Sequence, residues 1–168
     1  TSILIHWSMA AAIVAAWAIG SLLEGMPRGP DKAAAMGAHV LLGLAVGALL
    51  LPRILARIAG GAPESAAPGW ETRLAAAAHL LLYGLMLALP LSGLAIAMSG
   101  RAPMSVAGLF EIPNLLASYG LRPRLEAMHG MLAKLMLGLV VLHVAATLWH
   151  ALVRRDGVAS RMAPRGAR

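Results

Sequence analysis

Four histidines lie inside long apolar stretches of the sequence: His6, His39, His129 and His143. An ionisable side chain inside hydrocarbon is costly unless something binds it, so such a residue indicates a functional site. The chain contains no cysteine, which excludes disulfides, thiolate metal sites and iron–sulfur clusters. Histidine and methionine remain as soft or borderline metal ligands. The four histidines therefore predict a bound cofactor.

Four apolar stretches must position these side chains, and each is near or above the roughly 20 residues that cross a bilayer. Of the 168 residues, 60% are hydrophobic and 12% are charged, which is too apolar for an ordinary soluble domain. We expect helices at approximately residues 1–23, 33–57, 72–98 and 123–153, within one membrane-embedded domain that covers residues 1–168. More spans follow the first, so we interpret it as a retained helix rather than a signal peptide.

The connections between these helices are more polar than the helices themselves. The segment 60–70, rich in Gly, Ala and Pro, predicts a loop. The segment 99–124 mixes apolar residues with Pro, Asn and Gly, and we expect a short interfacial helix near Asn114 to Tyr119. The net charge of +7 lies at helix ends and in the tail, which predicts membrane lipid rather than nucleic acid as the partner.

Lysine and arginine accumulate on the cytoplasmic side of membrane proteins. With four spans, both termini share a side with the second connection, and that side holds eight such residues: Arg53, Arg57, Arg73, Arg154, Arg155, Arg161, Arg165 and Arg168. The opposite side holds five: Arg28, Lys32, Arg101, Arg122 and Arg124. We therefore expect a multi-pass protein with both termini in the cytoplasm.

The spacing of the histidines predicts two pairs at two depths. His129 and His143 are fourteen residues apart, about 40° short of four helical turns, so they share a face and are separated by roughly 21 Å. The alternating direction of the spans places His39 at the depth of His129. The same topology places His6 at the depth of His143.

Two ligands at each depth are too few for zinc, which takes three or four from the protein. They match the two axial positions of a haem iron. The predicted fold is therefore all-α, a four-transmembrane-helix bundle that encloses two b-type haems. A lone histidine can instead bond a neighbouring helix, but four at matched depths favour ligation. Glycines near them would let a flat macrocycle approach the backbone: Gly37, Gly43, Gly47, Gly130 and Gly138.

Other polar residues near the expected haems are candidate cofactor contacts. His79 and His150 belong to the cytoplasmic half, with Arg73 and other arginines at the same level, where they can hold haem propionates or a quinone headgroup. Binding to lipid phosphates is the alternative for them. Lys134, five residues after His129, either extends to the membrane surface or pairs with a propionate, and we favour the propionate.

Several short motifs, in order along nearly the whole chain, resemble the prokaryotic cytochrome b(561) family. They are Ile5-His6-Trp7, Ala38-His39-Val40, Ala78-His79-Leu80, Leu87-Ala88-Leu89-Pro90-Leu91-Ser92-Gly93-Leu94, Leu142-His143-Val144-Ala145-Ala146 and Met162-Ala163-Pro164-Arg165. The resemblance implies a four-helix protein of the bacterial inner membrane that carries two b haems. It also implies His6 with His143 and His39 with His129 as axial pairs, in agreement with the depth argument, and His79 and His150 near the cytoplasmic cofactor or the quinone.

One type of member in this family is a superoxide oxidase, so the resemblance implies an oxidoreductase that oxidises superoxide or another small donor and reduces ubiquinone. An anchor subunit that passes electrons between quinone and a partner dehydrogenase is the second hypothesis. A haem-free transporter or metal-handling protein is the third. The third is disfavoured because no Asp or Glu falls in the membrane interior and the chain shows no paired broken helices.

Overall fold

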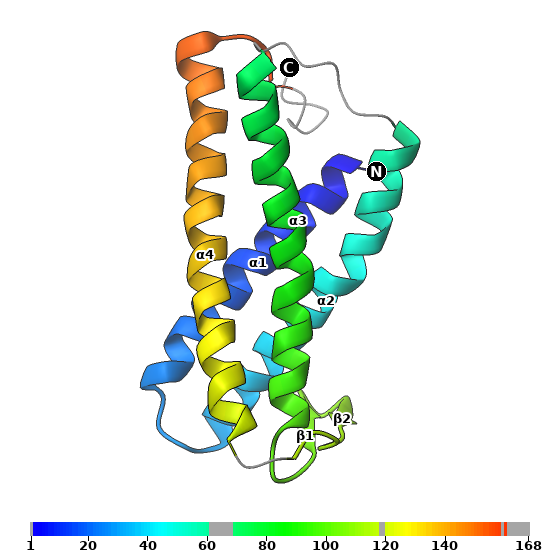
Figure 1. Cartoon of the computed structure of the whole chain (residues 1–168). Helices are drawn as coiled ribbons and strands as arrows, with labels where there is room; N and C mark the ends of the chain where they lie inside the picture. Colours follow the sequence, from blue (N-terminus) through cyan, green and yellow to red (C-terminus); the bar gives the residue numbers. More distant parts are fainter. Residues whose placement is uncertain (1, 61–68, 118–119, 159, 161–168) are drawn as a thin grey trace.

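The computed structural model describes residues 2–60, 69–117, 120–158 and 160. Its long elements are α1 (Ser2–Gly25), α2 (Pro30–Gly60), α3 (Gly69–Met98) and α4 (Leu121–Trp149), and α4 continues into a π-helical turn, η1 (His150–Arg154) (Figure 1). In lipid a helix satisfies its backbone N–H and C=O groups internally, so long apolar stretches become helices. Among the described residues, four helices are long and apolar enough to cross a membrane. The expected all-α fold with four membrane helices is confirmed.

The helices extend beyond their expected ends by up to three residues. Helix α2 begins at Pro30, because proline is favourable in the first helical position, where its missing N–H has no partner to lose. It continues past Pro52 to Gly60. Helix α4 begins at Leu121, directly after Gly120, which adopts a positive φ of 86°. Glycine reaches this left-handed region without steric cost, so it reverses the chain into α4.

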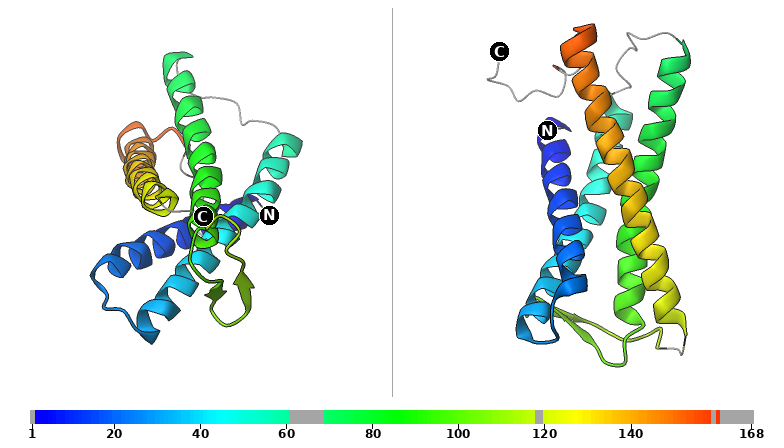
Figure 2. Two further views of the ribbon diagram at one scale, coloured as in Figure 1. Left: turned by 60° about the horizontal axis from the view of Figure 1, so that its bottom comes forward. Right: turned by 90° about the vertical axis from the view of Figure 1, so that its left-hand side faces the viewer.

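Packing follows the chain order: α1 lies against α2, α2 against α3, and α3 against α4 (Figure 2). Within the described part of the chain, α1 and α4 are not closely packed against each other. The start of α1 and the end of α4 lie at the same end of the bundle, opposite the hairpin formed by β1 and β2 (Figure 1). The buried core lies at mid-height and draws on all four helices: Met9, Val46, Leu50, Leu85, Met86 and Met136.

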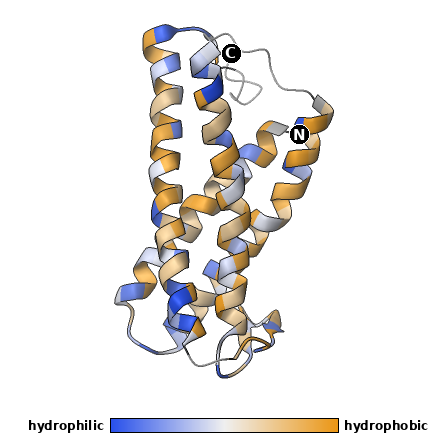
Figure 3. Cartoon of the chain, in the orientation of Figure 1, coloured by the Kyte–Doolittle hydropathy of each residue, from blue (hydrophilic) through white to orange (hydrophobic). Residues whose placement is uncertain are grey.

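Apolar side chains cover the outside of the bundle as well as its interior. Leu4, Leu80, Met131 and Leu152 are all exposed, and Figure 3 shows hydrophobic residues along the full length of the helices, with hydrophilic ones mainly toward their ends. An exposed apolar surface of this extent would drive association in water. It fits lipid as the surrounding solvent.

The connection between α3 and α4 corrects one expectation. Instead of an interfacial helix near Asn114 to Tyr119, the chain forms a two-stranded antiparallel hairpin, β1 (Met104–Val106) and β2 (Phe110–Ile112), followed by irregular structure through residue 117. Residues 118 and 119 lie outside the described residues. Ala107 and Gly108 both have positive φ, and Leu109 N–H bonds Val106 C=O at 2.9 Å, which is the geometry of a type I′ hairpin turn.

The hairpin packs on the bundle through one glycine. A Cβ at Gly37 would lie 2.7 Å from the backbone nitrogen of Ala107, closer than any side chain is tolerated. Val106 is fully buried and Ile112 nearly so, in a small cluster with Ala97 of α3. Gly37 therefore serves the contact between α2 and the hairpin.

Candidate cofactor site

His39 on α2 and His129 on α4 form the first pair, near the hairpin end of the bundle. Their ring centres are 6.1 Å apart, and the ring planes are inclined by 75°. His39 Nδ1–H donates a 2.8 Å hydrogen bond to the carbonyl oxygen of Ala16 on α1. His129 Nδ1 lies 2.8 Å from Ser92 Oγ on α3, whose hydroxyl donates to the carbonyl of Leu89 at 3.0 Å. Because the hydroxyl proton is used there, Ser92 Oγ accepts from His129 Nδ1–H.

Both hydrogen bonds fix the tautomer of the imidazole. With the proton on Nδ1, the lone pair of Nε2 is available to bind a metal ion. Histidines that ligate metals usually have their second ring nitrogen held by a carbonyl or another polar group, which also fixes the ring orientation. The sequence did not indicate Ser92 or the Ala16 carbonyl, since only the fold brings them to the rings.

Two glycines let these rings lie against neighbouring helices. A Cβ at Gly20 would be 3.0 Å from His39 Cε1, and a Cβ at Gly93 would be 3.4 Å from His129 Cε1. Of the five glycines singled out in the sequence, Gly37 lies against Ala107 and Gly47 against Pro90. A Cβ would meet no described atom within 4 Å at the remaining three: Gly43, Gly130 and Gly138. The glycines that lie against the histidine rings, Gly20 and Gly93, are therefore additional to those singled out for the approach of a macrocycle.

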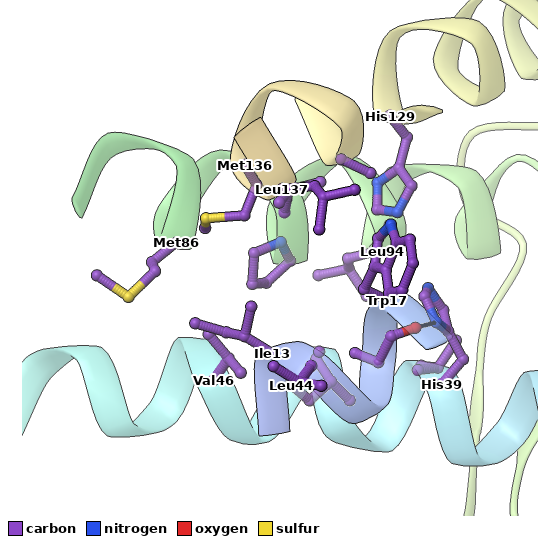
Figure 4. Close-up of a pocket in the computed structure, with 18 of the residues that line it drawn as sticks. Ile13, Trp17, His39, Leu44, Val46, Met86, Leu94, His129, Met136 and Leu137 are labelled. Atoms are coloured by element: carbon purple, nitrogen blue, oxygen red, sulfur yellow. Dashed lines mark hydrogen bonds between the residues drawn. The ribbon is translucent and has the colours of Figure 1, made fainter. Parts of the chain in front are cut away.

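A cavity of about 220 Å³ lies between the four helices beside this pair. Its lining is mainly apolar and includes Trp17, Met86 and Met136. Figure 4 shows His39 and His129 at one end of the pocket and Met86 at the other. An apolar cavity with a few convergent polar groups is the usual form of a cofactor site.

The second pair lies toward the opposite end, beyond the core cluster. The ring centres of His6 on α1 and His143 on α4 are 6.4 Å apart, with planes inclined by 67°. His79 on α3 reaches the same level, with its ring centre 5.5 Å from that of His143. The structure therefore brings together both expected pairs and gives His143 a second neighbour.

Arg53 on α2 lies at the same depth as the pair of His6 and His143. Its Nη2 donates a 3.0 Å hydrogen bond to His6 Nδ1, and its guanidinium carbon lies 5.9 Å from the ring centre of Tyr83. Its Nη1 is buried and has no hydrogen-bond partner among the described residues. Leaving a buried N–H of a charged group without an acceptor is costly, so Arg53 Nη1 is suited to bind an anionic or carbonyl acceptor.

The contact from Arg53 also constrains His6. A guanidinium only donates, so His6 Nδ1 accepts, and the ring proton lies on Nε2 in this arrangement. For His6 Nε2 to bind a metal ion, the ring proton would have to lie on Nδ1, and Arg53 would then have to turn to another acceptor. The two events are linked through one hydrogen bond.

The spacing of both pairs fits a shared metal ion. A metal–imidazole bond is about 2 Å long and the ring centre lies about 1 Å beyond the nitrogen, so two rings on opposite sides of one ion have centres roughly 6 Å apart. The observed distances are 6.1 and 6.4 Å. No group of three or more His, Asp or Glu side chains in the described segments is arranged to hold a metal ion. The remaining ligands would have to come from the cofactor, as in haem.

The other candidate residues have different surroundings. His150 pairs with Asp156, with His150 Nδ1 2.6 Å from Asp156 Oδ2. Arg73 and Lys134 are exposed, and Lys134 lies about 140° around α4 from His129, so the structure brings neither of them to the paired histidines. Arg53, by contrast, reaches the site, and its buried position was not evident from the sequence.

The fold defines a class: a multi-pass membrane protein whose helices bring histidines together in pairs at two depths. The family model of prokaryotic cytochrome b561 matches residues 1–165, so the chain belongs to this family. It is a membrane electron-transfer protein, and the family implies b-type haem as its cofactor. The resemblance found in the sequence motifs is confirmed.

Three curated relatives extend over nearly the whole chain. Cytochrome b561 homolog 1 of Escherichia coli (strain K12) is 27% identical, with 98% of this chain and 96% of the relative covered. Cytochrome b561 homolog 2 of the same strain is 31% identical, with coverages of 94% and 86%. The "Probable superoxide oxidase CybB" of Yersinia pestis is 29% identical, with coverages of 96% and 92%. The similarity thus includes all four helices.

Proposed function

We propose that this protein carries electrons across the bacterial inner membrane, from superoxide or another small donor at the periplasmic face to ubiquinone at the cytoplasmic face. His39 and His129 hold one b-type haem, and His6 and His143 hold a second. When bound, a haem with two axial histidines takes up and passes on single electrons. The excess of lysine and arginine on their side supports a cytoplasmic location for both termini.

Two histidine pairs at two depths carry this proposal, because they provide one relay point toward each membrane surface. The ring spacings of 6.1 and 6.4 Å suit two axial ligands each. The hydrogen bonds to Ala16 and Ser92 hold the rings of the first pair with Nε2 free. At the second pair, the unpartnered Nη1 of Arg53 would hold a carboxylate of the haem.

A second, more open cleft of about 420 Å³ near the hairpin supports the proposal that the electron donor binds at this end of the bundle. Met36 in its lining is about one helical turn from His39, and Arg101 and Arg122 give it positive charge. Glu126 offsets part of that charge, since it accepts a 2.8 Å hydrogen bond from Arg122. A positive cleft raises the local concentration of an anion such as superoxide. The name of the Yersinia pestis relative supports the same donor.

The test exposes the purified, haem-loaded protein in detergent to a superoxide source, with a short-chain ubiquinone present. We expect the haem spectrum to become reduced and ubiquinol to accumulate, and superoxide dismutase to suppress both. If superoxide reduces the haems and no quinol forms, the quinone-reducing activity is refuted. If quinol forms only with a co-purifying dehydrogenase subunit, the chain is instead a cytochrome b anchor subunit.

Replacing Ser92 with alanine should weaken haem binding at the first pair. The substitution removes the acceptor of His129 Nδ1–H, and loss of such a partner typically lowers metal affinity about 10–100-fold. Haem titration of the apoprotein, followed by absorbance, measures the change. Ser99→Ala is the matched control, because Ser99 makes the same bond to a carbonyl three residues back, 2.8 Å to Ile96, and no described bond to a histidine. Equal affinities for S92A and S99A would contradict the prediction.

A further inference from the structure

The hairpin covers one end of the cavity beside the first histidine pair. Val40 and Leu94 both line this cavity. They also pack against the small buried cluster of the hairpin, which includes Val106 and Ile112. The more open cleft near the hairpin shares no lining residue with the cavity. A group that comes from the water at this end of the bundle therefore meets packed side chains before it reaches the two histidines.

The core cluster covers the opposite end of the same cavity. Val46, Met86 and Met136 line the cavity and belong to the buried core, with exposures of 4%, 8% and 4%. Figure 4 shows Met86 at the far end of the pocket from the two histidines. Because a packed core has few voids larger than a water molecule, a group of the size of a porphyrin does not pass through this end. The cavity is therefore reached from the side of the bundle.

The side of the cavity between α1 and α4 is the open one. Helix α2 packs against α1 and α3, and α3 packs against α4, whereas α1 and α4 are not closely packed against each other in the described segments. Among the residues that line the cavity, two are exposed, Val14 at 56% and Trp17 at 41%, and both belong to α1. An exposed side chain in the middle of a membrane helix contacts lipid. The cavity therefore meets the hydrocarbon of the bilayer along α1.

Trp17 is well placed to cover this opening. Figure 4 shows it at the same end of the pocket as His39 and His129. The carbonyl of the preceding residue, Ala16, accepts the 2.8 Å hydrogen bond from His39 Nδ1. The indole of Trp17 is thus both a wall of the cavity and a part of the lipid-facing surface. A side chain changes rotamer without moving its helix, so this ring can turn aside while α1 stays in place.

We propose that haem reaches His39 and His129 from the bilayer, through the side of the bundle between α1 and α4, and that Trp17 covers this entrance, an inference that rests on the proposed ligation of haem by these two histidines. The macrocycle is flat and mostly apolar, so it is stable in hydrocarbon and does not need to cross an aqueous surface of the protein. Entry then requires a movement of Trp17 rather than the separation of packed helices.

The experiment follows, by absorbance, the transfer of haem from the haem-loaded protein in lipid vesicles to an excess of apomyoglobin in the buffer. We expect two kinetic phases, and the phase that is missing in His39→Ala identifies the haem of the first pair. For Trp17→Ala this phase should become about tenfold faster, because the cover of the entrance is lost. Trp149→Ala is the matched control, since Trp149 is 55% exposed and does not line the cavity. It should leave this phase unchanged.

A second substitution distinguishes an entrance from a merely structural role of α1. Val14→Trp adds a large ring at the exposed edge of the opening, so it should slow the same phase about threefold, whereas damage to the packing would accelerate it. Leu22→Trp is its control, because Leu22 is 67% exposed on α1 and does not line the cavity. The absorption spectrum of each variant should match that of the wild type, which shows that the axial ligands are unchanged.

Equal rates for W17A and W149A would overturn the inference, and so would a V14W protein that loses this haem as fast as L22W or faster. If W17A retains too little haem for the measurement, the comparison of V14W with L22W decides. Failure of the proposed function has a separate result: the wild type would then carry no haem whose binding depends on His39.

Discussion

Replacing His39 with alanine should remove one of the two proposed b-type haems and leave the other in place. The substitution deletes one of two ligands whose ring centres are 6.1 Å apart, while the second pair lies roughly four helical turns away, beyond the buried core. Reduced-minus-oxidised spectra and haem extraction should show the stoichiometry per chain fall by half. Loss of both haems from H39A would contradict independent sites at two depths.

The second level allows a sharper comparison, because His143 has two neighbours. The ring centre of His6 is 6.4 Å from that of His143, and the ring centre of His79 is 5.5 Å from it. The distance to His6 is the closer match to two axial ligands on opposite sides of an iron, whereas the distance to His79 approaches that of two rings in direct contact. His6→Ala should therefore lose the haem at this level, and His79→Ala should retain it. The opposite result would assign His79 as the ligand.

Replacing Gly20 with valine should also remove the haem held by His39, although Gly20 is not a ligand. A Cβ at this position already lies 3.0 Å from His39 Cε1, and the two γ-methyl groups of valine add bulk where the ring is held by its bond to Ala16. The ring must leave this position, which misplaces Nε2. Absorbance spectra and haem content of the purified variant measure the loss, which we expect to approach that of H39A.

Gly138→Val provides the matched control for this substitution. Gly138 is exposed on α4, and a Cβ there would meet no described atom within 4 Å. Both variants place the same β-branched residue in a membrane helix, so any general effect on helix formation is shared. A G20V protein that carried as much haem as G138V would show that the His39 ring does not need its close approach to α1.

The positions of the helices and the pairing of the histidines could be predicted from the sequence because both follow from simple periodicity. Apolar length sets the spans, and a separation of fourteen residues sets two depths on one face. The alternating direction of the chain then matches His6 with His143 and His39 with His129, and the structure brings these rings together.

Contacts that depend on tertiary packing could not be predicted in this way. Ser92 looks like any helical serine until α4 places His129 beside it. Lys134 is close to His129 in sequence but lies on another face of α4, where it is exposed. The hairpin at 104–112 was missed because its turn uses Ala107, with Gly108, at a positive φ where glycine, asparagine or aspartate is usual. Asp156 meets His150 only because η1 departs from α-helical geometry.

The absence of close packing between α1 and α4 has a consequence for how the protein matures. Each proposed ligand pair joins α4 to α1 or α2, so a bound haem iron would add a direct link from α4 to the first two helices, beyond the core contacts that they share. A group that binds only the assembled bundle stabilises it by mass action. Cells starved of haem should therefore accumulate less of this chain, because the helix bundle without haem is less stable and more readily cleaved by membrane proteases.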